Sequence, residues 1–139
     1  MAKSKRRINP SLTSKSKRIK QPSEKPLPSF LDLPPFFALE CETGKFCFKD
    51  CQKNDQLHLI SKIHTLSRMT WKQILSTSRK GSGHEKIGRK SIKASIPSNI
   101  TPDMDHFLAF RISGAARMVG YKTGQIFHIL WIGVGVYDH

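Results

Sequence analysis

The sequence predicts an α+β domain in which an antiparallel sheet of three to five strands carries two helices packed on one side. Two observations predict this class. Apolar residues recur at three- and four-residue steps across residues 55–76, which is the periodicity of a helix. Residues 107–137 are instead short apolar and β-branched runs separated by glycine-containing turns, as in a strand meander. With 37% hydrophobic residues in 139, the chain can build one core.

Residues 1–29 are predicted to form a disordered basic tail. They hold nine Lys or Arg against one Glu, a net charge of +8, and few large apolar side chains. Residues 30–139 hold fifteen Lys or Arg against nine Asp or Glu, a net charge of +6, so the single domain that they form is basic on its own. The tail can be interpreted as an electrostatic arm for RNA, as a solubilising segment, or as the result of a start assigned upstream of the true one.

The domain is predicted to begin with an aromatic β-hairpin and to continue with helices. Residues 36–40 and 46–48 are the expected strands, and Gly44 lies in the turn between them. Helix follows over residues 55–76. Thr70 is a suitable N-cap for a second short helix beginning at Trp71, which would divide this segment in two.

The rest of the domain is predicted to be a basic loop followed by a meander. Residues 76–99 are polar, basic and rich in glycine, and we interpret them as a loop on one face of the fold. Residues 122–125, which include Gly124, suit a hairpin turn between two of the later strands. The predicted strands are 107–112, 117–122, 125–132 and 134–137.

The charge indicates the class of partner. A net charge of +14 attracts polyanions and releases their counterions on contact, so nucleic acid or an acidic protein is expected. The chain begins with basic residues and not with an apolar signal, and we therefore expect a cytoplasmic protein. Its longest apolar run, residues 126–136, is shorter than the roughly 20 residues of a membrane-spanning helix, so no membrane partner is expected.

Three cysteines, Cys41, Cys47 and Cys51, are expected to be reduced in that compartment. With His58 they could supply three thiolates and an imidazole to zinc. The paired two-residue spacing of common zinc knuckles is absent, so we favour buried or incidental thiols and predict neither a metal nor a cofactor.

Polar side chains are unusually frequent in the predicted C-terminal strands, and strand alternation would send several of them to one face. Arginine can hold a phosphate and stabilise a pentacoordinate transition state, while histidine or a carboxylate moves protons. Cleavage of RNA through the ribose 2′-hydroxyl requires only such groups. The polar side chains of the predicted C-terminal strands are Arg111, Arg117, Tyr121, His128, Tyr137 and His139.

Residues 79–139 resemble the YoeB-type branch of the RelE/ParE toxin superfamily. The resemblance rests on the glycine-containing loop at 80–87, the strands at 110–112 and 116–121, and the Val-Tyr-Asp-His terminus. It implies that Glu85 is the general base, Arg117 the transition-state arginine and His139 the acid. Contacts to substrate are implied for Arg111 and Tyr137, and we extend them to Tyr121, Lys80, His84 and His128. The terminal Tyr-Asp-His order and the segment 30–55 depart from the family pattern, so the chain would be a divergent member.

The resemblance implies the toxin of a toxin–antitoxin pair, a metal-independent endoribonuclease that cleaves mRNA, free or on the ribosome, and is inhibited by an acidic antitoxin. One alternative is a non-catalytic basic module that binds RNA or protein. Another is a toxin that inhibits gyrase. At the level of residues, Arg111 and Arg117 could be solvated strand positions, Glu85 an ordinary loop charge, His128 a packed sheet histidine, and Tyr137 with His139 a frayed terminus. Trp71 and Trp131 are expected in the core.

Overall fold

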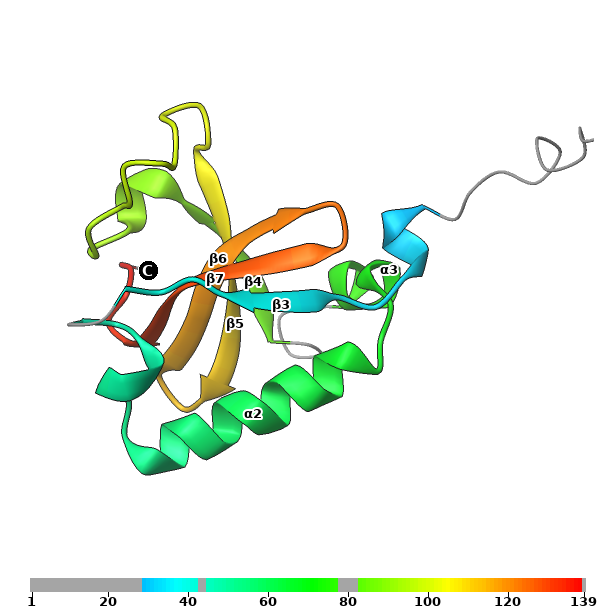
Figure 1. Ribbon diagram of the computed structural model, residues 1–139, viewed down its shortest axis with the longest axis horizontal. Helices are drawn as coiled ribbons and strands as arrows, with labels where there is room; N and C mark the ends of the chain where they lie inside the picture. The colour runs from blue at the N-terminus through cyan, green and yellow to red at the C-terminus, as the bar shows by residue number, and fades with distance from the viewer. Residues whose placement is uncertain (1–28, 43–44, 78–82, 139) are drawn as a thin grey trace, which may run out of the picture.

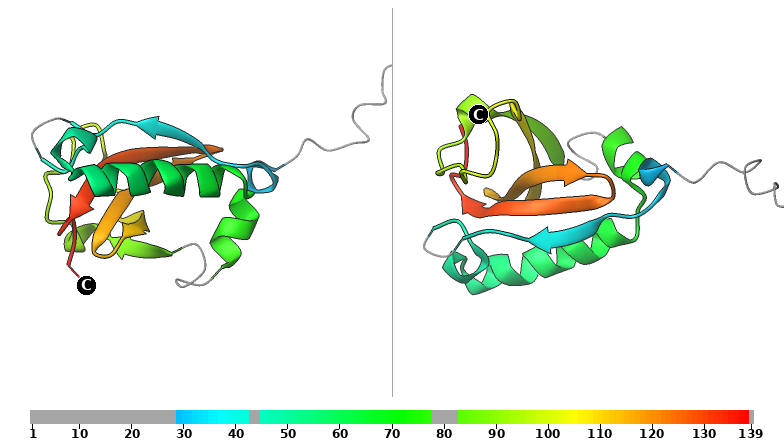
Figure 2. Two further views of the ribbon diagram at one scale, coloured as in Figure 1. Left: turned by 90° about the horizontal axis from the view of Figure 1, so that it is seen from below. Right: turned by 45° about the horizontal axis from the view of Figure 1, so that its top comes forward.

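The computed structural model describes residues 29–42, 45–77 and 83–138 and confirms the α+β class. Residues 1–28 of the predicted tail, Lys80 and His139 lie outside the described residues. Five strands form one sheet in the order β3-β7-β6-β5-β4, and α2 runs along one of its faces (Figures 1 and 2). The strands are β3 (Phe36–Leu39), β4 (His84–Gly88), β5 (His106–Ser113), β6 (Ala116–Thr123) and β7 (Ile126–Val134), and the helices are α2 (Lys53–Ser67) and α3 (Trp71–Ser76). Short 3₁₀ turns are η2 (Phe30–Asp32), η3 (Phe48–Asp50) and η4 (Arg89–Ser91).

The sheet is mixed, which corrects the expectation of a fully antiparallel one. Strand β3 pairs in parallel with β7, while β4 to β7 are antiparallel to their neighbours. The predicted aromatic hairpin is also wrong, because residues 46–48 do not pair with β3. Phe46 has a positive φ of 58° that turns the chain, and its carbonyl accepts a hydrogen bond from the Ile132 amide at 2.8 Å.

The predicted helical segment is confirmed, including its division at Thr70. The Thr70 hydroxyl accepts from the Gln73 amide at 3.1 Å, and the Gln73 side-chain oxygen accepts from the Thr70 amide at 2.9 Å. This capping box satisfies amides that the first turn of α3 leaves without helical partners. The Trp71 indole then donates to the Gln125 carbonyl at 2.9 Å, which fixes α3 beside the turn between β6 and β7.

Strand β4 lies within the segment that was predicted to be a loop. Among its residues only Ile87 is buried, so it carries too few apolar side chains to give a strand pattern. The β5-β6-β7 meander is confirmed, with Gly124 at φ 58° in the turn before β7. The expected last strand at 134–137 is reduced to an isolated bridge between Ile92 and Tyr137.

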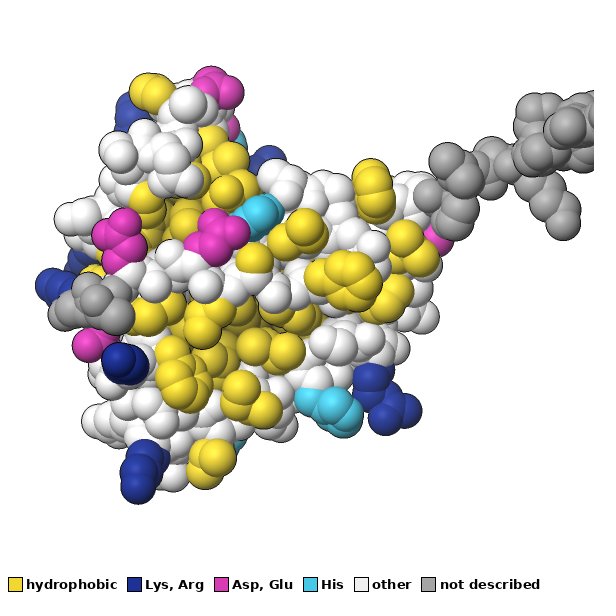
Figure 3. Space-filling model, in the orientation of Figure 1, with side chains coloured by type: hydrophobic (Ala, Val, Ile, Leu, Met, Phe, Trp, Pro, Cys, Tyr) yellow, Lys and Arg dark blue, Asp and Glu magenta, His cyan; other side chains and the backbone are white. Residues whose placement is uncertain are grey.

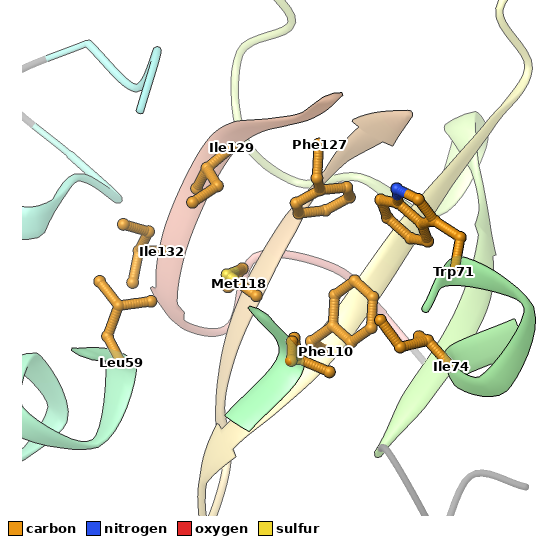
Figure 4. Close-up of a cluster of buried hydrophobic side chains, with 9 residues drawn as sticks. Leu59, Trp71, Ile74, Phe110, Met118, Phe127, Ile129 and Ile132 are labelled. Atoms are coloured by element: carbon orange, nitrogen blue, oxygen red, sulfur yellow. The ribbon is translucent and has the colours of Figure 1, made fainter. Parts of the chain in front are cut away.

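Two apolar cores lie on opposite faces of the sheet. In the helix-side core, side chains from α2 and α3 meet those of the central strands (Figure 4). The far-face core is covered by the segment after β4 and by the C-terminal residues. Trp71 belongs to the first core and Trp131 to the second, so both are confirmed as core residues. In the part of the chain that is described, no helix is long and apolar enough to cross a membrane.

Candidate functional site

Three of the predicted site residues project from the same face of the sheet. Phe110 and Met118 belong to the helix-side core, so their strand neighbours Arg111 and Arg117 project to the opposite face. Glu85 pairs in register with Ala109, a member of the far-face core, and therefore shares that face. We call Glu85, Arg111 and Arg117 the polar triplet.

The register places the triplet side chains close together. Arg111 is directly opposite Arg117 on neighbouring antiparallel strands, a relation that separates Cβ atoms by about 4.5–5.5 Å. Glu85 is diagonal to Arg111 across the β4-β5 pair, at a spacing of about 7–8 Å. Like charges directly opposite each other destabilise a sheet, and a bound anion would relieve this repulsion.

A further cation from α2 strengthens the positive potential. An added Cβ on Gly83 would lie 3.2 Å from the Arg111 Cβ and 3.4 Å from the Lys62 ammonium, so both side chains approach the same point. Burial, and then the charge of Arg111, lower the pKa of Lys62. Arg117 is held at its hairpin by donating to the Gly114 carbonyl at 2.8 Å and the Ala116 carbonyl at 3.1 Å. Sequence reasoning missed Lys62 because it belongs to a distant helix.

His84 does not join this site. It pairs with Phe110, and its ring lies 6.2 Å from the Phe110 ring on the helix side of the sheet, away from the triplet. Burial lowers the pKa of His84, so the neutral imidazole is favoured. His84 and the triplet therefore lie on opposite faces of the sheet, and the expected contact of His84 with substrate stays a prediction.

Tyr121 and His128 share the triplet's face but lie toward the other end of the strands. Tyr121 is four positions after Arg117 on β6, which corresponds to about 13 Å. The rings of Tyr121 and His128 stack at 4.5 Å with an interplanar angle of 9°. The expected binding site is therefore divided into two polar clusters.

The second cluster contains a hydrogen-bonded chain of three side chains. The His128 ring meets the Glu40 carboxylate at 2.5 Å through Nδ1 and the Thr123 hydroxyl at 2.6 Å through Nε2. Both ring nitrogens are thus engaged, and His128 has none to offer a phosphate in this arrangement. Burial, and then the Glu40 carboxylate, raise the pKa of Tyr121, which favours its neutral phenol. Glu40 and Thr123 carried no motif in the sequence and were not anticipated.

Tyr137 is 5% exposed and packs in the far-face core, so the alternative of a frayed end is wrong for this residue. Its expected contact with substrate stays a prediction. The predicted partner His139 and the loop residue Lys80 lie outside the described residues, and their roles remain predictions.

The cysteines differ from the expectation of reduced thiols. Cys41 and Cys47 form a disulfide, and Cys51 is a free thiol that donates to the Cys47 carbonyl. Burial is the largest cause that raises the pKa of Cys51, followed by Asp55 and Asp50. The described residues contain no group of three or more His, Cys, Asp or Glu side chains that could hold a metal ion.

An apolar groove lies between β3 and α2, where hydrophobic side chains gather on the surface (Figure 3). Its volume is about 340 Å³. The Phe36 amide donates to the Gln125 carbonyl just before β7, and the Glu40 amide donates to the Ile129 carbonyl within it. The backbone groups of Phe37 and Leu39 therefore face the open edge of the sheet. The groove is lined by Phe37, Leu39, Phe48, Leu59, Ile60, Ile63 and Ile129.

No protein-family model, curated protein or solved structure matches the chain. The site must therefore be interpreted from its own chemistry. One end of the sheet's far face carries two facing arginines and a carboxylate, and the Lys62 ammonium of α2 comes close to Gly83 beside Arg111. Such a set can bind a phosphodiester and accept a proton from a hydroxyl group.

Proposed function

We propose that the chain is a metal-independent endoribonuclease that cleaves mRNA, free or on the ribosome, and acts as the toxin of a toxin–antitoxin pair. The observation that carries this proposal is the directly opposed pair Arg111 and Arg117 with Glu85 one diagonal away. Their charges suit a phosphodiester, which gains a negative charge as it becomes pentacoordinate. The resemblance to the RelE/ParE superfamily assigns the same three residues to the reaction.

In the proposed reaction, Glu85 accepts the proton of a ribose 2′-hydroxyl as its oxygen attacks the neighbouring phosphorus. Arg111 and Arg117 hold the non-bridging oxygens and stabilise the charge that develops on them. The bond to the 5′-oxygen then breaks, and an acid protonates the leaving group. The resemblance assigns this acid to His139. The products are a 2′,3′-cyclic phosphate and a 5′-hydroxyl.

The proposed protein partner is an acidic antitoxin. A polypeptide could add a strand to the open edge of β3 and place apolar side chains in the groove beside α2. The net charge of +14 would accelerate encounter with an acidic chain. A short acidic reading frame next to this one would be the first candidate.

The principal rival is a non-catalytic basic module that binds RNA through the same cations. It is favoured by the position of the Arg117 guanidinium, which is bonded to its own hairpin carbonyls and would have to turn toward a substrate. The two functions differ in what the carboxylate does. A nuclease requires Glu85, whereas a binding module would bind RNA better without its negative charge.

The experiment is cleavage of a labelled mRNA by the purified full chain, with and without ribosomes and in the presence of EDTA. We expect discrete cuts that end in 2′,3′-cyclic phosphate. Loss of a general base costs about 10²–10⁴-fold in rate, so Glu85→Gln should abolish cutting while RNA affinity is kept. Lys86→Ala is the matched control, since Lys86 is the exposed neighbour on the opposite face of β4. If the intact chain binds RNA but never cuts it, the binding module is the better account.

A further inference from the structure

A second cavity lies on the triplet's side of the sheet, between the segment after β3 and the segment after β4. Figure 1 shows both segments at the end of the molecule that carries the C-terminus. The cavity has a volume of about 280 Å³. Its lining residues include the aromatic Phe46 and Trp131, the basic Lys45 and Lys93, and the acidic Glu42.

Phe46 is held there in an unusual backbone conformation. Its φ of 58° lies in the left-handed region, which bulky side chains rarely adopt. The hydrogen bond from Ile132 and the disulfide at the next residue, Cys47, fix this conformation. Residues kept in such conformations by their surroundings gather at ligand sites.

The cavity adjoins the polar triplet. An added Cβ on Gly133 would lie 3.3 Å from the Phe46 ring, so Gly133 leaves room for that ring on the sheet surface. Gly133 is in turn the register partner of Arg117. Phe46, Arg117 and Arg111 therefore follow one another across neighbouring strands on one face.

The charges at the rim are available to a ligand. The Lys45 ammonium lies 5.1 Å from the centre of the Phe46 ring. Lys93 pairs with Asp138 at 3.0 Å, but both side chains are more than half exposed, and such ion pairs contribute little in water. An aromatic ring flanked by exposed cations is an arrangement by which proteins bind single-stranded nucleic acid, through stacking on the base and attraction to the backbone.

We infer that this cavity binds an unpaired nucleobase of the RNA strand whose phosphate is held by Arg111 and Arg117. The base would stack on Phe46, with its N–H groups donating to Glu42, while Lys45 swings from the ring to the phosphate backbone. The inference rests on the proposed function in that RNA is the ligand. It does not depend on cleavage.

The test is binding of a fluorescent single-stranded oligonucleotide with 2′-O-methyl riboses, which lacks the attacking hydroxyl and cannot be cut. Phe46→Gly removes the ring and also suits the positive φ, so the fold should be retained; circular dichroism and thermal melting check this. Stacking of one base contributes about 1–3 kcal/mol by alanine substitution, which corresponds to roughly 5- to 150-fold in affinity. We expect a loss in that range for Phe46→Gly, near-normal binding for Phe46→Tyr, and no change for Lys86→Ala. Photochemical cross-linking of the bound strand should label the peptide that contains Phe46 or Trp131.

Two outcomes would overturn the inference and are distinguishable. If Phe46→Gly binds RNA as tightly as the intact chain while Arg111→Gln binds it weakly, RNA binds at the triplet but not in the cavity. Absence of any RNA binding by the intact chain would remove the nucleobase site together with the proposed function.

Discussion

The facing arginines predict that replacing Arg111 increases the stability of the fold and decreases the proposed activity. Like charges directly opposite on a sheet cost about 0.2–1 kcal/mol, and solvent screening favours the lower half of that range because Arg111 is exposed. Arg111→Gln should therefore raise the free energy of unfolding. For a domain of this size the melting temperature should rise on the order of 2 °C.

The same substitution should slow the proposed cleavage of RNA. Loss of one donor to the developing charge of a transition state costs about 10²–10³-fold in rate. Arg117→Gln is the matched comparison: it relieves the same repulsion but also removes the hydrogen bonds to the Gly114 and Ala116 carbonyls, so it should not stabilise the fold.

Thermal melting of the intact chain and both variants, at low salt and at high salt, measures the stability effect. The stabilisation by Arg111→Gln should shrink as salt screens the repulsion. The rate of mRNA cleavage measures the expected loss of activity. A lower melting temperature for Arg111→Gln at low salt would refute the reasoning, since it would mean that Arg111 stabilises the folded sheet.

Three further predictions concern other parts of the molecule. Burial lowers the pKa of His84 in the folded chain, so the unfolded chain binds a proton at this residue more readily. The stability of the fold should therefore decrease as the pH falls below about 6.5. Thermal melts at pH 5 and pH 8 should show a smaller decrease for His84→Leu. Gly120→Ala would place a Cβ 1.7 Å from the His128 carbonyl oxygen, and denaturant unfolding should show a loss above about 2 kcal/mol, whereas Gly88→Ala, with open space around it, should change stability far less. Leu39→Asp combined with Ile60→Asp should abolish inhibition by the proposed acidic antitoxin without reducing the proposed RNA cleavage, as measured by cleavage with and without the antitoxin.

The sequence predicted the elements whose signals are local. Helical periodicity and the Thr70 cap defined α2 and α3, and the glycine turn at 124 defined the hairpin between β6 and β7. Arg111 and Arg117 share a face because the register shifts between Arg111 and Ser113; a regular ladder counted from the Ser113–Ala116 pair would have set Arg111 opposite Met118, which the sequence does not reveal. A short polar strand such as β4 could not be predicted from the sequence. Its pairing depends on the neighbouring strand β5 and not on an apolar pattern of its own.

The second polar cluster shows why part of the site could not be predicted. Glu40 and His128 are 88 residues apart, and they meet only because β3 pairs in parallel with β7, on the side away from β6. A local reading favoured an antiparallel hairpin for β3, since adjacent aromatic segments separated by a glycine turn usually pair with each other. In that arrangement Glu40 would have faced residues 46–48, and His128 would have kept a free nitrogen for substrate. The parallel pairing instead engages both nitrogens, so proton transfer in the proposed reaction belongs to the triplet's end of the sheet, where Glu85 lies.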